Sequence, residues 1–277
     1  MRRLLTTAIL LAFGFGLAGC SGASDASSTT TTVASVSPTS GASSAAWKTP
    51  EPGSSFDYFL SVSPGTVGTG EVVVLDGEYT PISDVQAVHE RDAYAVCYMN
   101  GGAWEPYRTD SDQFSEAVKG KVMEGWADEK WFDVRDPELL PIMKARVVEC
   151  KAKGFDGVEF DNMDGYLHDS GFPLTQEDQI AYAQKLAGLA HEAGLGAALK
   201  NGVDMIPSLV GSFDFAINEQ CIEFEECAVY QPFVAAKKAV FNVEYVDRPD
   251  RCEIAKENGI VSIFARLEVD GPGVGCP

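Results

Sequence analysis

The chain has 277 residues and a formal net charge of −20, with 41 acidic against 21 basic side chains. This balance argues against nucleic-acid binding, because phosphate contacts require a basic face. An acidic cleft would attract a cationic ligand, although acidity that serves only solubility is an equal alternative.

The first 46 residues predict export and a membrane anchor. Two arginines precede an apolar run over residues 4–15, which has the length of a signal peptide and is too short to span a bilayer. The following string LAGC, residues 17–20, resembles the bacterial lipobox, so we expect removal of residues 1–19 and lipidation of Cys20. Residues 20–46 are rich in Ser, Thr and Ala, which predicts a flexible tether; an O-glycosylated stalk is the alternative.

Residues 47–277 predict a single domain, because no second linker and no repeat of fixed period interrupts them. Short apolar or alternating runs bounded by turn residues indicate eight strands. These runs cover residues 56–61, 71–77, 94–101, 156–162, 196–201, 215–220, 239–245 and 261–268.

Helical patterns separate most of these strands. One helix begins after Asp136, a second is capped by Thr175 with Asp178 and ends at Gly194, and a third lies within residues 249–259. Strands that alternate with helices pair in parallel through right-handed crossovers. Eight such units predict an α/β fold, the (β/α)₈ TIM barrel.

Two connections of this barrel are expected to be unusual. The first, residues 62–70, is too short for a helix, so this β–β connection is irregular. A ninth apolar run, residues 130–134, is assigned to a long loop after the third strand.

Polar residues gather at the carboxyl ends of the predicted strands, where barrels of this type hold their active sites. Side chains alternate along a strand, so Glu159 and Asp161 share one side while Val158 and Phe160 share the other. The apolar pair suits the helix layer, which turns both acids toward the barrel axis. The strand-end residues are Asp76, Tyr98, Asn100, Asp161, Asn162, Lys200, Asn201, Glu219, Gln220, Glu244 and Glu268.

Carboxylate chemistry is favoured over the alternatives. The three histidines are not paired at metal-ligand spacing, and no phosphate-binding loop or G-x-S-x-G motif is present in the sequence. We therefore expect neither a metal nor a cofactor. Glycoside hydrolysis needs two acids held in different environments, and Asp161 and Glu219 on different strands form the predicted pair.

Several strings resemble glycoside hydrolase family 114, the endo-α-1,4-polygalactosaminidases. They are WFDVRDPELLPIMKARVVECKAKGFDGVEFDNMDGY, SGFPLT, ALKN, FDFAINEQCIEFEEC and AVFNVEY, and they follow the family's order. The resemblance implies a (β/α)₈ fold and internal cleavage of α-1,4-linked galactosamine polymers, such as deacetylated biofilm galactosaminogalactan. The segment DGEYTPIS, residues 76–83, departs from the family's D-x-F-D-T-type pattern.

The resemblance also implies site residues. The Asp of the family's D-N-x-D-G-Y motif and the Glu of its N-E-Q-C motif fall on Asp161 and Glu219. By analogy with retaining α-galactosidase barrels, Asp161 is the expected nucleophile and Glu219 the acid/base. The expected substrate-binding residues are Asp57, Asp76, Tyr98, Asn162, Asp164, Tyr166, Lys200, Asn201, Gln220, Glu244 and Glu268.

Some of these residues have a structural alternative. Glu159 with Lys200, and Arg266 with Glu268, could be buried ion pairs that only shape the barrel. Aromatic residues of the long third loop either stack on sugar rings or fill the loop's own core; they are Trp104, Tyr107, Trp126 and Trp131.

Six cysteines remain in the predicted mature chain, an even number that is typical of an oxidising compartment. We expect the disulfides Cys221–Cys227 and Cys252–Cys276. Cys97 and Cys150 are either buried thiols or a third bridge.

The expected protein is a monomer in the bacterial cell envelope, anchored by lipid alone on the outer side of the cytoplasmic membrane and acting on a cationic polysaccharide. Two alternatives remain open. One is a non-catalytic lipoprotein that binds a cationic saccharide, and the other is a hydrolase of a neutral or N-acetylated α-galactoside. Salt distinguishes the second, because only cleavage of a polycation weakens as ionic strength rises.

Overall fold

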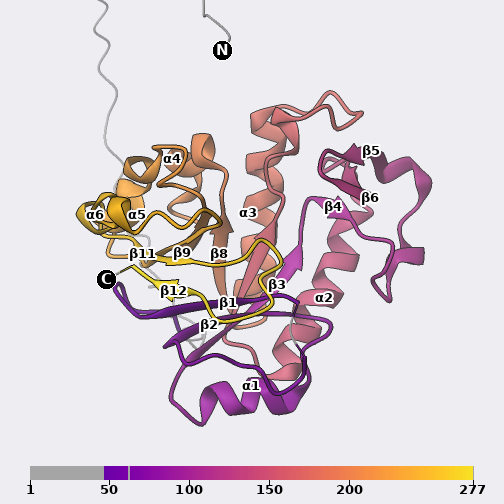
Figure 1. Ribbon diagram of the computed structural model, residues 1–277. Helices are drawn as coiled ribbons and strands as arrows, with labels where there is room; N and C mark the ends of the chain where they lie inside the picture. The colour runs from indigo at the N-terminus through magenta and orange to yellow at the C-terminus, as the bar shows by residue number, and fades with distance from the viewer. Residues whose placement is uncertain (1–46, 62, 277) are drawn as a thin grey trace, which may run out of the picture. The chain divides into compact units, whose positions relative to one another are not determined.

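The computed structural model describes residues 47–61 and 63–276 (Figure 1). The predicted signal peptide, the predicted lipidation site Cys20 and the predicted tether lie outside the described residues. Within the described ranges, no helix combines the length and the apolar character needed to cross a membrane.

Eight parallel strands form a nearly closed barrel, and all eight predicted strands are confirmed. In chain order, each strand pairs with the next. A short antiparallel strand, β12 (Val274–Gly275), lies against the last of them. The barrel strands are β1 (Phe56–Phe59), β2 (Val72–Asp76), β3 (Tyr94–Asn100), β7 (Gly157–Asp161), β8 (Gly196–Lys200), β9 (Phe215–Glu219), β10 (Val240–Glu244) and β11 (Val261–Phe264).

The last barrel strand is shorter than predicted. It ends at Phe264, so Glu268 belongs to the following loop. That loop closes the barrel at the seam, because the backbone N–H groups of Leu60 and Ser61 donate to the carbonyl oxygen of Val269.

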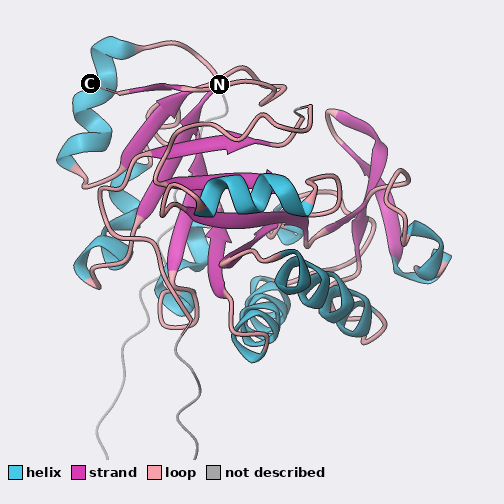
Figure 2. Ribbon diagram, turned by 90° about the horizontal axis from the view of Figure 1, so that it is seen from below, coloured by secondary structure: helices cyan, strands magenta, loops and turns pink. Residues whose placement is uncertain are grey.

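Helices cover the outside of the barrel (Figures 1 and 2). The predicted capping box of Thr175 and Asp178 opens α3, whose end is followed by Gly194 in the left-handed region. The α-helices are α1 (Ile82–His89), α2 (Leu139–Lys153), α3 (Gln176–Glu192), α4 (Ile206–Leu209), α5 (Gln231–Ala235) and α6 (Cys252–Glu257). The short 3₁₀ turns are η1 (Ser111–Gln113), η2 (Glu116–Val118), η3 (Gly165–Leu167), η4 (Val203–Met205), η5 (Cys227–Tyr230) and η6 (Pro249–Arg251).

The long connection after β3 forms a small sheet of its own. Strands β4 (Ala103–Trp104), β5 (Lys119–Met123) and β6 (Trp126–Phe132) pair antiparallel in the order β4-β6-β5 and lie to one side of the barrel (Figures 1 and 2). The predicted place of residues 130–134 is confirmed, but a strand holds part of them. The connection between β1 and β2 contains no helix among its described residues, as predicted.

Side chains of the barrel strands alternate between two cores. Tyr58 and Phe241 belong to the cluster inside the barrel, whereas Val158 and Phe160 pack in the larger cluster beneath the helices. Glu159 therefore points into the barrel, and its fully buried carboxyl accepts a hydrogen bond from the Tyr58 hydroxyl at 2.8 Å.

Three disulfides cross-link the domain. Both predicted bridges, Cys221–Cys227 and Cys252–Cys276, are present. The open question about Cys97 and Cys150 is resolved in favour of a bridge, which joins β3 to α2. Three disulfides are typical of a protein that folds outside the cytosol.

Candidate active site

Three neighbouring strands end in charged residues at the carboxyl end of the barrel: Asp161 on β7, Lys200 on β8 and Glu219 on β9. The residue after each one has a left-handed backbone, which is costly for a non-glycine residue and recurs at functional sites. These residues are Asn162 (φ 60°), Asn201 (φ 48°) and Gln220 (φ 65°). The chain thus turns sharply directly after each charged side chain.

Close packing against the end of β3 holds the backbone of Asp161. The N–H groups of Gly101 and Gly102 donate to its carbonyl oxygen at 3.0 and 3.1 Å. A Cβ atom on Gly102 would lie 1.7 Å from the carbonyl oxygen of Asn162, so only glycine permits this approach.

The ammonium of Lys200 binds three carboxylates. Its Nζ lies 3.1 Å from Asp161, 3.3 Å from Glu219 and 3.4 Å from Glu159, and the side chain is only 1% exposed. Burial opposes the positive charge, but Asp161, Glu219 and Glu159 outweigh it and raise the pKa of Lys200 well above its ordinary value. Lys200 is therefore charged, and its ammonium lies beneath the carboxylates of Asp161 and Glu219.

Asp161 and Glu219 are also held by neutral donors. The Tyr98 hydroxyl donates to Asp161 at 2.9 Å, and the Asn201 amide donates to Glu219 at 3.1 Å. The Tyr245 hydroxyl donates to the other oxygen of Glu219. The side chains of Asp161 and Glu219 are still 16% and 28% exposed, so the two carboxylates are oriented yet accessible to a ligand.

A cavity of about 920 Å³ opens above these two carboxylates. Among the described residues that line it, seven are acidic and one, Arg108, is basic, which makes the cavity suited to a cation. The acids are Asp76, Glu105, Glu129, Asp161, Asp164, Glu219 and Glu268.

The structure brings together most of the residues predicted for the site. Those that line the cavity are Asp76, Tyr98, Asp161, Asn162, Asp164, Asn201, Glu219 and Glu268. Lys200 lies beneath the cavity, where its ammonium is fully used by the three carboxylates. The other four predicted residues, Asp57, Tyr166, Gln220 and Glu244, lie elsewhere.

Asp57 and Glu244, which were predicted to bind substrate, both point away from the barrel interior. Asp57 points outward and accepts bonds from the backbone N–H groups of residues 69 and 70, while Tyr58 takes the inward position. Glu244 also points outward, and Tyr245 after it reaches the site. Both strands are buried on both faces, so polarity alone did not reveal which residues point inward.

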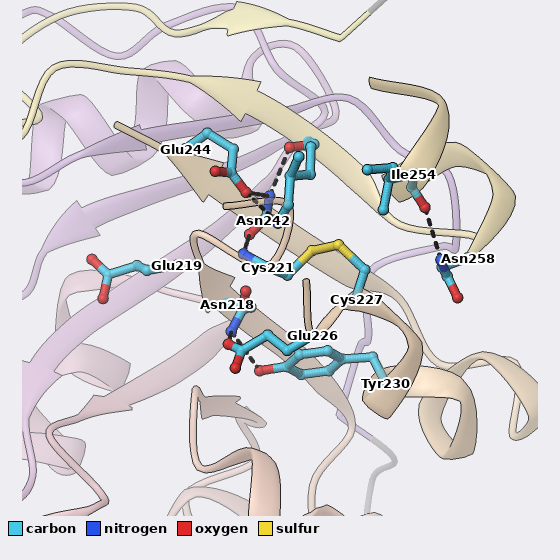
Figure 3. The surroundings of a disulfide bond; sticks show 12 residues. Asn218, Glu219, Cys221, Glu226, Cys227, Tyr230, Asn242, Glu244, Ile254 and Asn258 are labelled. Carbon is cyan, nitrogen blue, oxygen red and sulfur yellow. Dashed lines mark hydrogen bonds between the residues drawn. A yellow bond between two sulfur atoms is a disulfide. The ribbon is translucent and has the colours of Figure 1, made fainter. Parts of the chain in front are cut away.

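Figure 3 shows the outward group that holds Glu244. Its carboxylate accepts hydrogen bonds from the Asn242 amide and the backbone N–H of Ile222, both at 2.8 Å, beside the Cys221–Cys227 disulfide. Glu219 extends away from this group, whereas Asn218, its neighbour in the chain, is directed to Tyr230. Glu244 therefore stabilises the loop after β9.

Two further predicted residues are not among those that line the cavity, and one suggested ion pair does not form. Tyr166 packs beside α3, where its hydroxyl accepts a bond from the Gln176 amide. The backbone N–H of Gln220 donates to the carbonyl oxygen of Val243 on β10. The suggested buried pair of Arg266 and Glu268 does not exist, because Arg266 is exposed and binds Asp270.

The sheet β4-β6-β5 adds a wall to the cavity that the sequence did not reveal. Arg108 binds Glu105 at 2.7 Å and Asp76 at 2.8 Å, and the Tyr107 hydroxyl lies 2.9 Å from both Glu105 and Glu129. Burial, reinforced by Glu105, raises the pKa of Glu129 to about 7. The string EPYR, residues 105–108, carried three of these groups, but nothing in its spacing indicated a site.

The four aromatic residues of this region divide between the two predicted roles. Tyr107 and Trp126 are about half exposed and line the cavity. Trp131 is buried and stacks on His168, and Trp104 lies under the ammonium of Lys119 at 4.4 Å. Two of the four are thus placed to meet a ligand.

No group of three or more His, Cys, Asp or Glu side chains is arranged to hold a metal ion within residues 47–61 and 63–276. The described site is instead a pair of accessible carboxylates on a buried ammonium. Carboxylate pairs at the carboxyl end of a (β/α)₈ barrel are typical of glycosidases.

The sequence profile of Glycoside-hydrolase family GH114 matches residues 36–277, so the chain belongs to this family and is a glycosidase. An uncharacterized protein of Deinococcus radiodurans is 28% identical over 225 residues, with 70% of this chain and 71% of the relative covered.

The solved structures that are similar to the domain include the following two. Ega3 of Aspergillus fumigatus, in complex with galactosamine, is 27% identical with a TM-score of 0.79, covering 83% of this chain and 98% of its own. The glycoside hydrolase domain of PelA from Pseudomonas aeruginosa shares the fold at 17% identity and a TM-score of 0.62, covering 79% of this chain and 97% of its own.

Proposed function

We propose that this protein is an endo-α-1,4-polygalactosaminidase, in which Asp161 is the nucleophile and Glu219 the general acid/base. The observation that carries the proposal is the pair of accessible carboxylates, bound to one buried ammonium, at the floor of an acidic cavity. Family membership and the galactosamine bound by the similar Ega3 support the substrate class.

In the first step, protonated Glu219 gives its proton to the glycosidic oxygen while an Asp161 oxygen attacks the anomeric carbon. The bond to the leaving sugar breaks, and an ester joins the remaining sugar to Asp161. In the second step, ionised Glu219 takes a proton from water, whose oxygen attacks the same carbon and releases Asp161. Lys200 and Tyr98 keep the Asp161 carboxylate oriented throughout.

The short distance between the two acids supports retention of configuration. One oxygen of each carboxylate binds the same nitrogen, at 3.1 and 3.3 Å, so these two oxygens cannot lie farther apart than the sum of the two distances. This upper limit for the nearest oxygens lies at the lower edge of the span of about 6.5–9.5 Å between the carboxyl groups of inverting enzymes, which favours the shorter separation of about 5–5.5 Å found in retaining enzymes.

The acidity of the cavity supports a cationic polymer as substrate. Free galactosamine units carry ammonium groups, which would meet Asp76, Asp164 and Glu268 along the cavity wall. Tyr107 and Trp126 would supply apolar surfaces for the sugar rings.

Lipidation of Cys20 and a position at the outer side of the cytoplasmic membrane are part of the same proposal. They rest on the LAGC string and on the disulfides, which are typical of an extracellular or envelope protein. Such an anchor would keep the enzyme at the cell surface, where it would meet secreted polysaccharide.

The test is product release from purified α-1,4-polygalactosamine and from its fully N-acetylated form. The wild type is expected to shorten the deacetylated polymer to oligomers, and Glu219→Gln is expected not to. Glu244→Gln is the matched control, since Glu244 is a buried glutamate directed away from the cavity. Binding of the cationic polymer without any cleavage would favour a saccharide-binding protein instead.

A further inference from the structure

Glu159 is a buried acid for which the two-carboxylate reaction has no role. It lies two residues before Asp161 on β7, its side chain is fully enclosed, and it cannot touch a substrate. Its Oε1 accepts from the Tyr58 hydroxyl at 2.8 Å and lies 3.4 Å from the ammonium of Lys200. Its Oε2 has no hydrogen-bond partner among the described residues.

The polar groups that surround Glu159 belong to the site. Those that face it are Tyr58 on β1, Lys200 on β8 and Glu219 on β9. Tyr98 on β3 is its neighbour in register, and Asp161 follows it on β7. The neighbour in register on β8 is Ala198, which is apolar. One ammonium is thus shared by three carboxylates, of which the deepest has no contact with solvent.

We propose that Glu159 is a positioning residue of this site, which holds the Lys200 ammonium beneath Asp161 and Glu219 and couples its own proton to that of Glu219. This inference rests on the proposed function for its consequence in the reaction. The coupling itself rests on geometry, because Lys200 lies 3.4 Å from one acid and 3.3 Å from the other.

The electrostatic argument gives the coupling a sign. An ionised Glu159 adds negative charge near Glu219, which makes Glu219 hold its proton more tightly. A protonated Glu159 adds no negative charge, so the positive charge of Lys200 then acts on Asp161 and Glu219 alone. Burial raises the pKa of Glu159 to about 7 against the opposing charge of Lys200, so the change occurs near neutral pH.

The expected consequence is that Glu159 keeps the general acid protonated at higher pH than it would be alone. In the Glu159→Gln variant the side chain is neutral at every pH, as protonated Glu159 is in acid. Wild type and variant should therefore agree within about twofold in kcat/KM below about pH 5. Above neutral pH, kcat/KM of the variant should begin to fall at a lower pH than that of the wild type. The midpoint of this alkaline fall should be lower by about one pH unit.

The test combines this pH profile with a titration that does not need activity. Carboxyl resonances of the protein labelled with carbon-13 at glutamate are followed against pH in wild type and Glu159→Gln. We expect one resonance that titrates near pH 7 to disappear in the variant, and the midpoint of Glu219 to move to lower pH. The Glu219 resonance is assigned by its loss in Glu219→Gln.

Two further variants complete the test, the first as a control for a general structural effect and the second as a probe of the hydrogen bond to Glu159. Asp156→Asn removes a partly buried carboxylate at the opposite end of the same strand, and it should leave the Glu219 midpoint and the pH profile in place. Tyr58→Phe removes the hydroxyl that stabilises ionised Glu159, so the titration of Glu159 should move to higher pH.

The outcomes separate the two proposals. An unchanged Glu219 midpoint in Glu159→Gln, together with an unchanged alkaline limb, overturns the coupling even if the polymer is cut. A shifted midpoint in a protein that cuts no galactosamine polymer supports the coupling and rejects the proposed function.

Discussion

The acidic side chains at the two ends of the barrel differ in how many cationic partners they have. At the amino end, Asp156 lies 2.8 Å from His89, and Asp214 lies 2.8 Å from His191. Each Asp also accepts a bond from a backbone N–H of the neighbouring strand, β3 or β8. Trp47 stacks on His191 with ring centroids 3.8 Å apart, which fixes the start of the domain to this end.

At the carboxyl end, one ammonium binds three carboxylates, and Arg108 is the one basic side chain beside seven acidic ones among the described residues that line the cavity. This difference indicates that the amino end contributes to stability and that the carboxyl end is suited to binding a ligand. Acids that each have their own partner stabilise the fold. An excess of negative charge around one cation lowers stability, and a cationic ligand can neutralise the remaining charge.

Loss of either reacting acid should give the largest effect. Asp161→Asn and Glu219→Gln should each lower kcat on α-1,4-polygalactosamine by about 10³-fold or more, because each removes a covalent or proton-transfer role. The measurement is release of reducing ends, with circular dichroism to show that the fold is intact. Full activity in either variant would remove that residue from the mechanism.

Removal of the shared cation should give the next largest effect. Lys200→Met leaves three carboxylates without their ammonium, and it should lower the free energy of unfolding by about 3–5 kcal/mol. Urea denaturation at pH 7 measures this, with the exposed Lys144→Met as control. A loss below about 1 kcal/mol would show that the three acids do not depend on Lys200.

A change at the amino end should affect stability but not activity. Asp214→Asn should cost about 1–3 kcal/mol and leave kcat/KM within about twofold of the wild type. Burial tends to raise the pKa of Asp214, but His191 and the N–H of Ala197 outweigh it, and the net pKa is lowered. Its stabilisation is therefore present above about pH 4 and lost as pH falls through the lower folded pKa, a slope that the variant should lack.

The smallest effect concerns the cavity wall. The pKa of Glu129 is raised to about 7, so the folded state binds a proton that the unfolded state has already released above about pH 4.5. The contribution of Glu129 to the free energy of unfolding therefore falls between about pH 4.5 and 7. Between pH 5 and pH 8, the free energy of unfolding should decrease by on the order of 1 kcal/mol less in Glu129→Gln than in the wild type, as measured by urea denaturation. An identical fall in both proteins would contradict the raised pKa.

The sequence predicted the parts of the site that depend on strand order. Parallel strands of a barrel end at the same rim, so the positions of Asp161, Lys200 and Glu219 followed once eight strands were recognised. Glu159 and Asp161 were assigned to the correct face because Val158 and Phe160, which alternate with them along the strand, are apolar.

Other parts were beyond the sequence for physical reasons. Tyr58 and Tyr245 were missed because strands buried on both faces show no polar alternation, and Asp57 and Glu244 looked equally suited to the site. The wall built from Glu105, Arg108 and Glu129 depends on how a small antiparallel sheet folds against the rim. Local sequence does not determine that contact.

The most direct test of the central claim is a crystal structure of the Glu219→Gln variant with a galactosamine oligomer. The account predicts an oligomer in the cavity above Lys200, with one anomeric carbon within about 3.5 Å of the Asp161 carboxylate and its linking oxygen beside residue 219. An oligomer bound elsewhere, with Asp161 and residue 219 free of sugar, would contradict it.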